Sequence, residues 1–442
     1  MKQLLGLVLV SIVGCGGGSN ASPSALGSAP IANDPGVSAP DASLPPRVGM
    51  DASTEAGAPR AIANGSTGEA GTSPLGKGTS YYVDGTAGND DNSGTSSASA
   101  WKSITKVNAS SFNPGDNVLF REGETFTGSI VLKSSGTATD PITYGSYGLG
   151  PRPTIRSAAL ANAIDSNAAE WIILQDLRVD GSTAEGVHIK NGGHLTVRNL
   201  DLQNTCGGIQ AWFTTDIWVE NNVVHNGCGE AIWSYQVTGG FHVIGNRTYP
   251  MSGATTDGMQ LDYTPTYEVR CNYVDQGHQA GNEKGDLTIT RSNHGLVRDN
   301  VFVGGNYGLG MVGLAEGGAA DNTVTNNHFV DNQNIQSWAS GIKFDDNPAE
   351  VWVPAPPAFS PGGPTHMTIT DNLIEDDNNG IYIYDINAAG DTLTIDGNVA
   401  NGTKTPFEID QSGIGSAISD NDADAGSPLG LTSCAGGGMP EP

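Results

Sequence analysis

Positively charged residues are scarce in this 442-residue chain, which has 20 Lys and Arg against 47 Asp and Glu and a formal net charge of −27. A protein that binds nucleic acid needs Lys and Arg clustered on one face, so the composition argues against such a partner. Charged residues make up only 15% of the chain and hydrophobic residues only 37%, whereas glycine occurs 62 times. Abundant Gly, Asn, Asp, Ser and Thr favour short strands and tight turns over long helices.

A long apolar run is missing from the N-terminus, where the run from Leu4 to Val13 is too short to span a bilayer and fits a signal peptide. The run leads into Gly14-Cys15, which resembles the lipobox of bacterial lipoproteins, whose cysteine is lipidated after cleavage. This resemblance implies a lipoprotein signal peptide over residues 1–15 and lipidation at Cys15, with the lipid as the only membrane contact. The expected location is the outer membrane or cell surface, and an ordinary secreted protein is the alternative.

Aromatic residues are nearly absent from two segments. Residues 16–78 consist largely of Ala, Gly, Ser and Pro. Such a segment cannot bury enough apolar area to offset the entropy of ordering, so we predict a disordered tether. Residues 412–442 have a similar composition and are predicted to form a flexible tail. The folded part is then expected to comprise an N-terminal cap with the first strands over 79–150 and a repeat domain over 151–411.

Cysteine is rare, with five residues in the chain. Cys206 and Cys228 stand in matching contexts, "NTCGG" and "NGCGE". An exported compartment permits a disulfide between them. Two small buried residues stacked in neighbouring repeats would leave the same pattern, so both interpretations stay open. Cys271 and Cys434 carry no readable signal.

A β-branched residue followed three positions later by Asn recurs, mostly at intervals of 24 to 28 residues. The instances are "VENN" (219–222), "VIGN" (243–246), "VRCN" (269–272), "VRDN" (297–300), "VTNN" (324–327), "ITDN" (369–372) and "IDGN" (395–398). An alternating strand, usually opened by Gly, runs in step with them, as in "GMQLD" (258–262) and "GIKFD" (341–345). Each repeat therefore predicts three short strands, which describe one coil of a stacked solenoid with a ladder of Asn at a tight turn.

This combination resembles the right-handed parallel β-helix of the pectate-lyase superfamily, asparagine ladder included, over about 150–405. The resemblance implies an all-β, single-stranded, right-handed parallel β-helix of about 9–10 coils. The preceding segment, "YYVDGTAGNDDNSG" onward, resembles the opening of many exported β-helix polysaccharide-degrading proteins. Trp101, Ile104 and Val107 share one face of a helix expected over 99–109, which would cap the first coil. The acidic loop 88–94 is expected to be a solvated turn, with a calcium site as the alternative.

Outward-pointing residues of the Gly-led strands are unusually rich in aromatic and charged side chains. They are His188 and Lys190, Gln210 and Trp212, Gln260 and Asp262, Lys343 and Asp345, and Tyr382 and Tyr384. Sugar rings bind against aromatic faces and fixed polar groups, so this face predicts a saccharide groove. The expected substrate-binding residues are Lys190, Trp212, Gln260, Lys343, Asp345 and Tyr382. The segment 347–366 and the segment 248–256 would flank the groove, the first either as a wall or as a packed excursion.

An acid and a base lead two successive strands. If the repeat phase holds, Glu230, Asp257 and Lys284 occupy one ladder position in three consecutive coils, about 5 Å apart per step. A surface ion-pair ladder, which contributes little, is the alternative interpretation. The functional interpretation is a reaction centre at the edge of the groove, near Gln260, Asp262, Asp286 and Arg291.

In the lyase members of the superfamily, Ca²⁺ held by acidic side chains binds the uronate carboxylate, and Lys or Arg removes the C5 proton. The resemblance implies Ca²⁺ held by Glu230, Asp257, Asp262 and Asp286, and catalysis by Lys284, Asp257, Arg291 and His188. Calcium is needed because Asp257 alone would raise the pKa of Lys284 and spoil it as a base. The leading hypothesis is therefore a monomeric, surface-anchored lyase acting on an acidic, uronate-containing polysaccharide.

Three alternatives remain at this level. The stretch "TTDGMQLD" is similar to a strand of polygalacturonase-type glycosidases, although the second Asp pair, the Gly-His-Gly and the Arg-x-Lys of that family are missing at the required phase. Asp257 with Glu230 or Asp286 could still act as a hydrolytic acid/base pair. Uronate epimerisation shares the proton-abstraction step. A non-catalytic, carbohydrate-binding surface protein is the third alternative.

Overall fold

The computed structural model describes residues 74–157, 162–252, 257–278, 285–314, 320–332, 339–347, 366–384, 392–409, 415–419 and 421–423. The predicted signal peptide with Cys15, nearly all of the predicted tether and Lys284 lie outside these residues. The described residues belong to one compact unit that extends from Ser73 to Pro442. Among them, no helix is long and apolar enough to cross a membrane.

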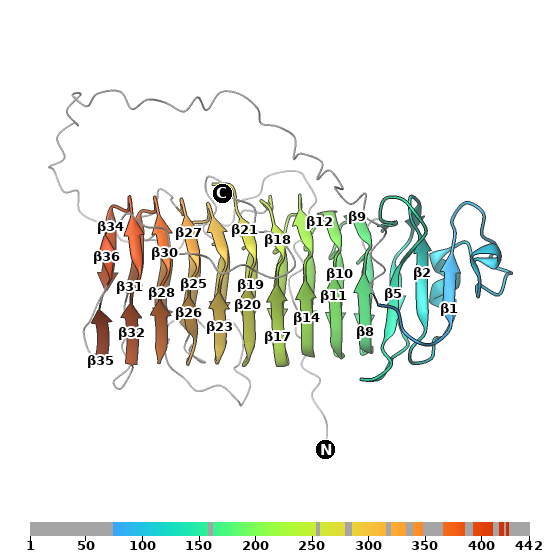
Figure 1. The fold of residues 1–442 in the computed structure, drawn as a ribbon, viewed down its shortest axis with the longest axis horizontal. Coiled ribbons are helices and arrows are strands. Elements are labelled where there is room, and N and C mark those ends of the chain that lie inside the picture. The colour runs from blue at the N-terminus through green and yellow to red at the C-terminus, as the bar shows by residue number, and fades with distance from the viewer. Residues whose placement is uncertain are drawn as a thin grey trace, which may run out of the picture. The chain divides into compact units, whose positions relative to one another are not determined.

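Three parallel sheets, here named A, B and C, run side by side along the molecule (Figure 1). Sheet A has 13 strands: β1 (Ser80–Val83), β2 (Asn117–Arg121), β5 (Ile142–Tyr147), β8 (Glu170–Gln175), β11 (Gly193–Arg198), β14 (Thr215–Glu220), β17 (Thr238–Ile244), β20 (Tyr267–Arg270), β23 (Gly295–Arg298), β26 (Thr323–Thr325), β29 (Met367–Thr370), β32 (Thr392–Asp396) and β35 (Gly415–Ser419). Sheet B has 12 strands: β3 (Thr125–Thr127), β6 (Thr154–Arg156), β9 (Arg178–Ser182), β12 (Asp201–Thr205), β15 (Val223–His225), β18 (Arg247–Thr248), β21 (Tyr273–Asp275), β24 (Val301–Val303), β27 (His328–Val330), β30 (Leu373–Glu375), β33 (Val399–Asn401) and β36 (Asp422–Ala423).

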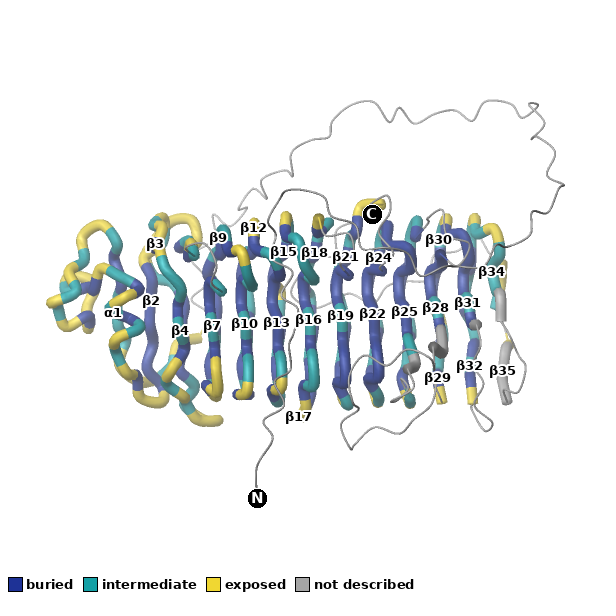
Figure 2. The backbone as a smooth tube through the Cα atoms, turned by 180° about the vertical axis from the view of Figure 1, so that it is seen from behind, coloured by how far each residue is buried: buried dark blue, intermediate teal, exposed yellow. Residues whose placement is uncertain are grey.

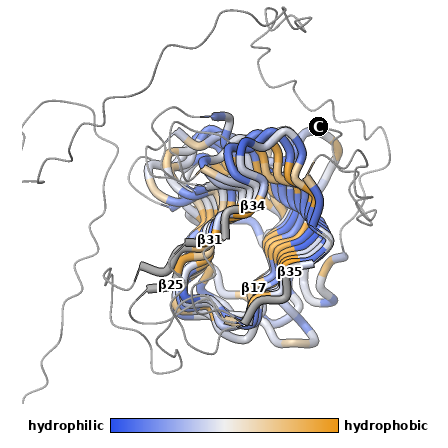
Figure 3. Tube along the Cα trace, turned by 90° about the vertical axis from the view of Figure 1, so that its left-hand side faces the viewer, coloured by the Kyte–Doolittle hydropathy of each residue, from blue (hydrophilic) through white to orange (hydrophobic). Residues whose placement is uncertain are grey.

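Sheet C has 11 strands: β4 (Ile130–Leu132), β7 (Ile164–Asn167), β10 (Val187–Lys190), β13 (Ile209–Trp212), β16 (Ile232–Tyr235), β19 (Met259–Asp262), β22 (Leu287–Thr290), β25 (Tyr307–Leu314), β28 (Ser340–Asn347), β31 (Asn379–Tyr384) and β34 (Thr405–Ile409). Each coil passes through one strand of A, one of B and one of C before it returns to A (Figure 3). Between 151 and 411 sheet A contributes β8 to β32, so this part holds about nine coils, and β1 to β5 show that the sheets begin before residue 151. The predicted all-β solenoid is therefore confirmed, and it is longer than the repeat pattern indicates.

Alternation within the strands builds the interior. In β10, Val187 and Ile189 are fully buried, whereas His188 and Lys190 between them are only half-buried. Because adjacent strands pair in parallel and in register, the inward residues of successive coils stack on each other to form one continuous core. Figure 2 shows the buried runs along neighbouring strands of sheet C.

The asparagine ladder stands at the bend from sheet A to sheet B and is confirmed. Asn246 is typical: its backbone N–H and its Nδ2 both donate to Asn272 Oδ1, at 2.8 and 3.1 Å, and its Nδ2 also donates to Val219 O. The ladder consists of Asn222, Asn246, Asn272, Asn300, Asn327, Asn372, Asn398 and Asn421. The left-handed residue of the bend is the one before each ladder Asn, for example Asn221 with φ 54° and Cys271 with φ 58°. The ladder Asn therefore satisfies buried backbone groups, and its neighbour makes the turn.

The N-terminal part of the described chain includes η1 (Ser97–Ser99) and the six-residue helix α1 (Ile104–Ala109). Ser103 caps α1 by accepting from the Lys106 N–H, and Ile104 and Val107 are buried. The role of this helix as a cap over the first coil stays a prediction. In the acidic loop, Asp90 accepts from the Lys102 and Ser103 N–H groups and from the Ser103 hydroxyl, which is how an acid anchors a turn.

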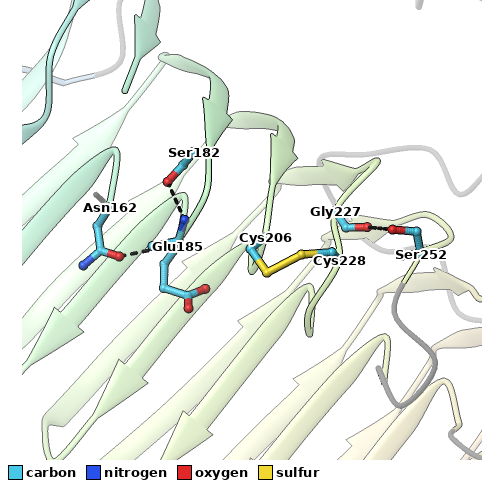
Figure 4. Close-up of a disulfide and its surroundings, with 8 residues drawn as sticks. Asn162, Ser182, Glu185, Cys206, Gly227, Cys228 and Ser252 are labelled. Carbon is cyan, nitrogen blue, oxygen red and sulfur yellow. Dashed lines mark hydrogen bonds between the residues drawn. A yellow bond between two sulfur atoms is a disulfide. The ribbon is translucent and has the colours of Figure 1, made fainter. Parts of the chain in front are cut away.

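Cys206 and Cys228 form a disulfide, with their Cα atoms 4.5 Å apart (Figure 4). Of the two interpretations of this pair, the structure selects the cross-link. It joins the bends of two successive coils just before β13 and β16. Cys271 is disulfide-bonded too, and its partner lies outside the described residues.

Candidate functional site

Sheet C presents two outward rows of side chains in continuous register. The first row holds, in coil order, Asp165, His188, Gln210, Trp233, Gln260, Thr288, Gly310, Lys343 and Tyr382. The second row holds Asn167, Lys190, Trp212, Tyr235, Asp262, Thr290 and Val312, and the backbone register continues it to Asp345 and Tyr384. All six predicted substrate-binding residues lie in these rows, and their binding role stays a prediction. Sequence reasoning missed Trp233 and Tyr235, because Ala231 replaces the glycine that opens most of the other strands.

The aromatic rings of this face meet edge to face. His188 and Trp212 have ring centroids 5.4 Å apart at 89°, and Trp212 and Trp233 are 5.1 Å apart at 76°. On sheet A, by contrast, Trp218 stacks flat on His242 at 3.8 Å, so that each ring covers the other. Edge-to-face pairs turn successive rings in different directions and leave ring faces available to a ligand.

Asp262 fixes one of these rings. Its Oδ2 accepts from Trp233 Nε1 at 2.9 Å and from Gln260 Nε2 at 2.8 Å, and its residue is only 5% exposed. At the other end of the face, His188 Nδ1 lies 2.9 Å from Asp165 Oδ1, and this hydrogen bond lowers the pKa of Asp165. The face therefore carries anchored carboxylates among its rings.

Three acids share one ladder position, which lies two residues before the first residue of a strand of sheet C. We name this set the acidic column. It contains Glu185, Glu230 and Asp257, with Gly207 between the first two and Gly285 after the last. Asp257 is fully buried, and its Oδ1 accepts from the Gly285 N–H at 2.9 Å. The Glu185 carboxylate fills the place that a side chain at Gly207 would take, since a Cβ there would overlap with Glu185 Oε2. Glu230 and Asp257 thus occupy successive coils about 5 Å apart, while Glu185 lies two coils before Glu230 and extends its carboxylate over the glycine between them.

Glu185 is the perturbed acid of this column. Burial raises its pKa to about 7, and the charge of Glu230 adds to the rise, while His188 and the Gly207 amide oppose it. Figure 4 shows the Glu185 carboxylate beside the Cys206–Cys228 disulfide, with the Glu185 N–H donating to Asn162 Oδ1. A half-buried carboxyl group that titrates near neutral pH can donate a proton to a bound ligand.

The expected pairing of Asp257 with Lys284 is wrong by one residue. Met259 pairs with Leu287, so Gly285 takes the ladder position of Asp257. Lys284 precedes Gly285 and lies outside the described residues. Glu230 and Asp257 do share one position, as expected.

The other predicted catalytic residues are not brought to Asp257. Arg291 follows β22 at the opposite end of the strand, where it is 3% exposed and its guanidinium lies 3.9 Å from the Tyr263 ring. His188 lies three strands away from β19, or roughly 14 Å. The four predicted catalytic residues therefore do not form one centre.

The predicted calcium ligands also separate. Asp286 is the ladder partner of Gly258, which precedes Asp262 by four residues in the neighbouring strand. The backbones of Asp286 and Asp262 are therefore separated by about 13 Å along the strand direction. Asp286 is fully buried, and burial together with the charges of Asp275, Asp377 and Asp257 raises its pKa well above the usual range. In the described part of the chain no three His, Cys, Asp or Glu side chains are arranged to hold a metal. Calcium stays a prediction, without a ligand set that these residues supply.

Connection lengths single out sheet C. Every connection from sheet A to sheet B between β8 and β33 has two residues, for example from Arg198 to Asp201 and from Arg298 to Val301. The connections that vary lie at the two edges of sheet C, as from Thr248 to Met259 and from Asn347 to Met367. The predicted flanking segments 248–256 and 347–366 belong to these connections and fall largely outside the described residues. Loops that vary on a constant scaffold are where binding sites form.

Comparisons with solved structures agree with this architecture. A lacto-N-biosidase of glycoside hydrolase family 136 from Eubacterium ramulus superposes with a TM-score of 0.55 at 16% identity, covering 78% of this chain and 68% of that one. The chain has the right-handed parallel β-helix fold. A rhamnogalacturonan lyase superposes with a TM-score of 0.48 at 14% identity, covering 78% of this chain and 88% of that one.

Two sequence comparisons cover parts of the β-helix. A family model described as periplasmic copper-binding protein (NosD) matches residues 152–350. The lacto-N-biosidase of Bifidobacterium longum subsp. longum is 32% identical over 156 residues, which are 32% of this chain and 9% of that protein. The match thus spans less than a tenth of this curated relative. Among the described residues, no group of three His, Cys, Asp or Glu side chains is arranged to hold a copper ion, although His294 and His366 both lie 3.3–3.4 Å from Asp321.

Proposed function

We propose that this β-helix is a glycan-cleaving enzyme that binds its substrate across sheet C and hydrolyses a glycosidic bond at the acidic column. The observation that carries the proposal is the Glu185 carboxyl group, whose pKa of about 7 keeps much of it protonated near neutral pH. Glu185 lies two coils before Glu230, and its carboxylate reaches over Gly207, the position between them. Glycoside hydrolysis requires a proton donor of this kind beside a second carboxylate. The lacto-N-biosidases that match the chain in sequence and in fold support the same chemistry.

The proposed reaction uses the two glutamates in different roles. Glu185 donates its proton to the glycosidic oxygen, while the Glu230 carboxylate attacks the anomeric carbon and the carbon–oxygen bond breaks. Water then cleaves the glycosyl ester, and Glu185 takes the proton of that water. The backbones of Glu185 and Glu230 are two coils apart, but the Glu185 carboxylate occupies the Gly207 position, one coil or roughly 5 Å from the position of Glu230. Carboxyl groups of retaining glycosidases have a spacing of this size, so we propose that the product keeps the anomeric configuration of the substrate.

Elimination from a uronate polymer is the weaker alternative. It relies on Lys284 facing Asp257, and the strand register puts Gly285 in that position instead. Acidic residues on sheet C, among them Asp165 and Asp262, repel a polyanion, and the net charge of −27 adds to this. We therefore propose a neutral glycan as substrate, reached by an exported protein that Cys15 anchors to the cell surface.

Product analysis tests the proposal. The full-length chain is incubated with pectate, with alginate and with a glycan that ends in lacto-N-biose, and both reducing ends and the ultraviolet absorbance of unsaturated uronate are followed. We expect new reducing ends without absorbance. Glu185→Gln and Glu230→Gln should each lower kcat by about 10²-fold or more. The activity of the wild-type protein should fall as pH rises through about 7, because Glu185 then loses the proton that it donates.

The matched control is Glu220→Gln, which changes a half-buried glutamate on sheet A. It should leave the rate unchanged. Absorbance at the uronate band would overturn hydrolysis in favour of elimination. Binding without any product would overturn catalysis altogether.

A further inference from the structure

From β7 to β22, the residue that follows each strand of sheet C, at the edge where the chain leaves for sheet A, adopts a left-handed backbone. This column, here named the left-handed column, consists of Ala168 (φ 64°), Asn191 (φ 56°), Phe213 (φ 54°), Gln236 (φ 53°), Tyr263 (φ 49°) and Arg291 (φ 52°). The corresponding column after sheet A holds Asp176, Asn199, Asn221, Gly245, Cys271, Asp299, Asn326, Asp371 and Gly397. Asn, Asp and Gly tolerate this conformation, and large side chains do so at an energetic cost. Sheet C therefore carries bulky residues where the turn itself favours small polar ones.

Packing accounts for two of the three bulky residues. Tyr263 is 1% exposed and its ring lies under the Arg291 guanidinium, whose Nη1 donates to the Tyr263 hydroxyl. This pair fills space inside the bend and stabilises it. Phe213 is different, because it is 45% exposed and contributes little to the interior. A strained residue without a packing reason indicates a function.

Phe213 belongs to an aromatic pair at the surface. Its ring meets the Tyr235 ring edge to face at 5.3 Å and 81°, and Tyr235 in turn meets Tyr263 at 5.7 Å. Tyr235 lies in the second outward row next to Trp212. The amide of Gln236 donates to the Tyr235 hydroxyl at 3.4 Å, so polar groups flank the rings. The pair thus extends the aromatic face of sheet C over its edge.

We propose that Phe213 and Tyr235 form a sugar-stacking subsite that holds a pyranose ring of the substrate away from the cleaved bond. The proposal rests on the hydrolytic function proposed above and adds a second point of attachment to it. A sugar suits this place because its C–H face packs on an exposed ring while its hydroxyls reach amides such as Gln236 and Asn191. One exposed ring with polar neighbours is too small for a stable protein partner.

The test separates a binding role from a structural one. Phe213→Asn places at this position the residue that Asn191 supplies one coil earlier, so the melting temperature should stay the same or rise. KM for the glycan that ends in lacto-N-biose should rise about 3- to 10-fold with kcat unchanged, because the contact is made equally in the ground and transition states. Phe213→Trp, which keeps an aromatic ring at this position, should have the KM of the wild type. The same variants are also compared by affinity electrophoresis in pectate, alginate and that glycan.

Trp171→Asn is the matched control, since Trp171 has φ 58° but stacks on His194 at 3.8 Å on sheet A. It should leave KM unchanged. A loss of stability in Phe213→Asn, or an unchanged KM in a folded variant, would overturn the subsite while the proposed function stands. A wild-type chain that neither cleaves nor binds any of the three glycans would overturn both.

Discussion

At the scale of single residues, the protonation of an acid depends on what the neighbouring coils place around it. Glu185 and Asp286 both have raised pKa values because burial removes water and other carboxylates lie near. Asp286 stands at an inward corner where other coils have small residues, namely Gly186, Gly208, Ala231, Gly258, Gly308, Gly341 and Gly380. Asp165 shows the opposite effect, because its His188 partner lowers its pKa. The same side chain can therefore serve as a proton donor or as an anchored anion.

The stability of the protein should reflect the proton on Glu185. Its folded pKa of about 7 exceeds the ordinary 4.5, so the stabilising contribution is complete below 4.5 and is lost as pH rises through about 7. Gln does not ionise, so Glu185→Gln should gain stability relative to the wild type across this window, by about 2 kcal/mol after allowance for solvent screening. Denaturant unfolding at a series of pH values measures the difference. A difference that does not change with pH would show that the pKa of Glu185 is not raised.

At the scale of elements, each bend has its own chemistry. The bend from sheet A to sheet B has two residues from β8 to β33, and from Asn222 onward it ends in an Asn that satisfies the backbone of the coil before it. In the described residues, the bends at sheet C vary in length and have only short runs of such bonds, as from the Gly305 N–H to Asn332 and from the Asn332 N–H to Asp377. The first kind sets the register of the coils, and the second kind is free to carry the residues of a site.

Removal of a central ladder residue should destabilise the β-helix. In Asn272→Ala, the Asn246 N–H loses its acceptor, and the Val243 and Arg270 carbonyl groups lose their donor, all in a buried place. We expect a loss of about 2–4 kcal/mol in the free energy of unfolding. Asn421→Ala at the half-exposed end of the ladder should cost clearly less. Equal losses for the two variants in denaturant titrations would contradict this account.

At the scale of the whole molecule, negative charge is the dominant property. The chain carries a net charge of −27, while its eight histidines and five of its described arginines lie close to carboxylates. Such pairs neutralise acids locally and leave the excess negative charge to act on incoming ligands.

Salt should therefore change the preference among glycans. Raising the ionic strength from about 0.01 to 0.1 M shortens the screening length from about 30 to 10 Å and weakens the repulsion of a polyanion. Retardation by pectate in affinity electrophoresis should increase, while retardation by the neutral glycan should stay the same. Stronger pectate binding at low salt would point to a local cationic subsite and against a neutral substrate.

The features that repeat from coil to coil could be predicted from the sequence. The features that occur in a single coil, namely the register at Lys284 and the raised pKa of Glu185, could not. The Asn spacing and the alternation in "GMQLD" give the solenoid, its ladder and the outward rows because a stacked coil repeats its chemistry. The one-residue error at Lys284 comes from aligning Gly285 with Gly258, whereas in the structure Asp286 takes that corner. The raised pKa of Glu185 depends on a carboxylate reaching over Gly207, which no single repeat reveals. Only the three-dimensional register brings these groups together.

The constant two-residue bend has a consequence for the evolution and the engineering of this scaffold. The asparagine ladder fixes the register between successive coils. The connections at the two edges of sheet C can therefore be exchanged, lengthened or shortened while the stacking of the coils is kept. Selectivity for a new ligand could be grafted there, in the way that antibody loops are exchanged on a conserved framework.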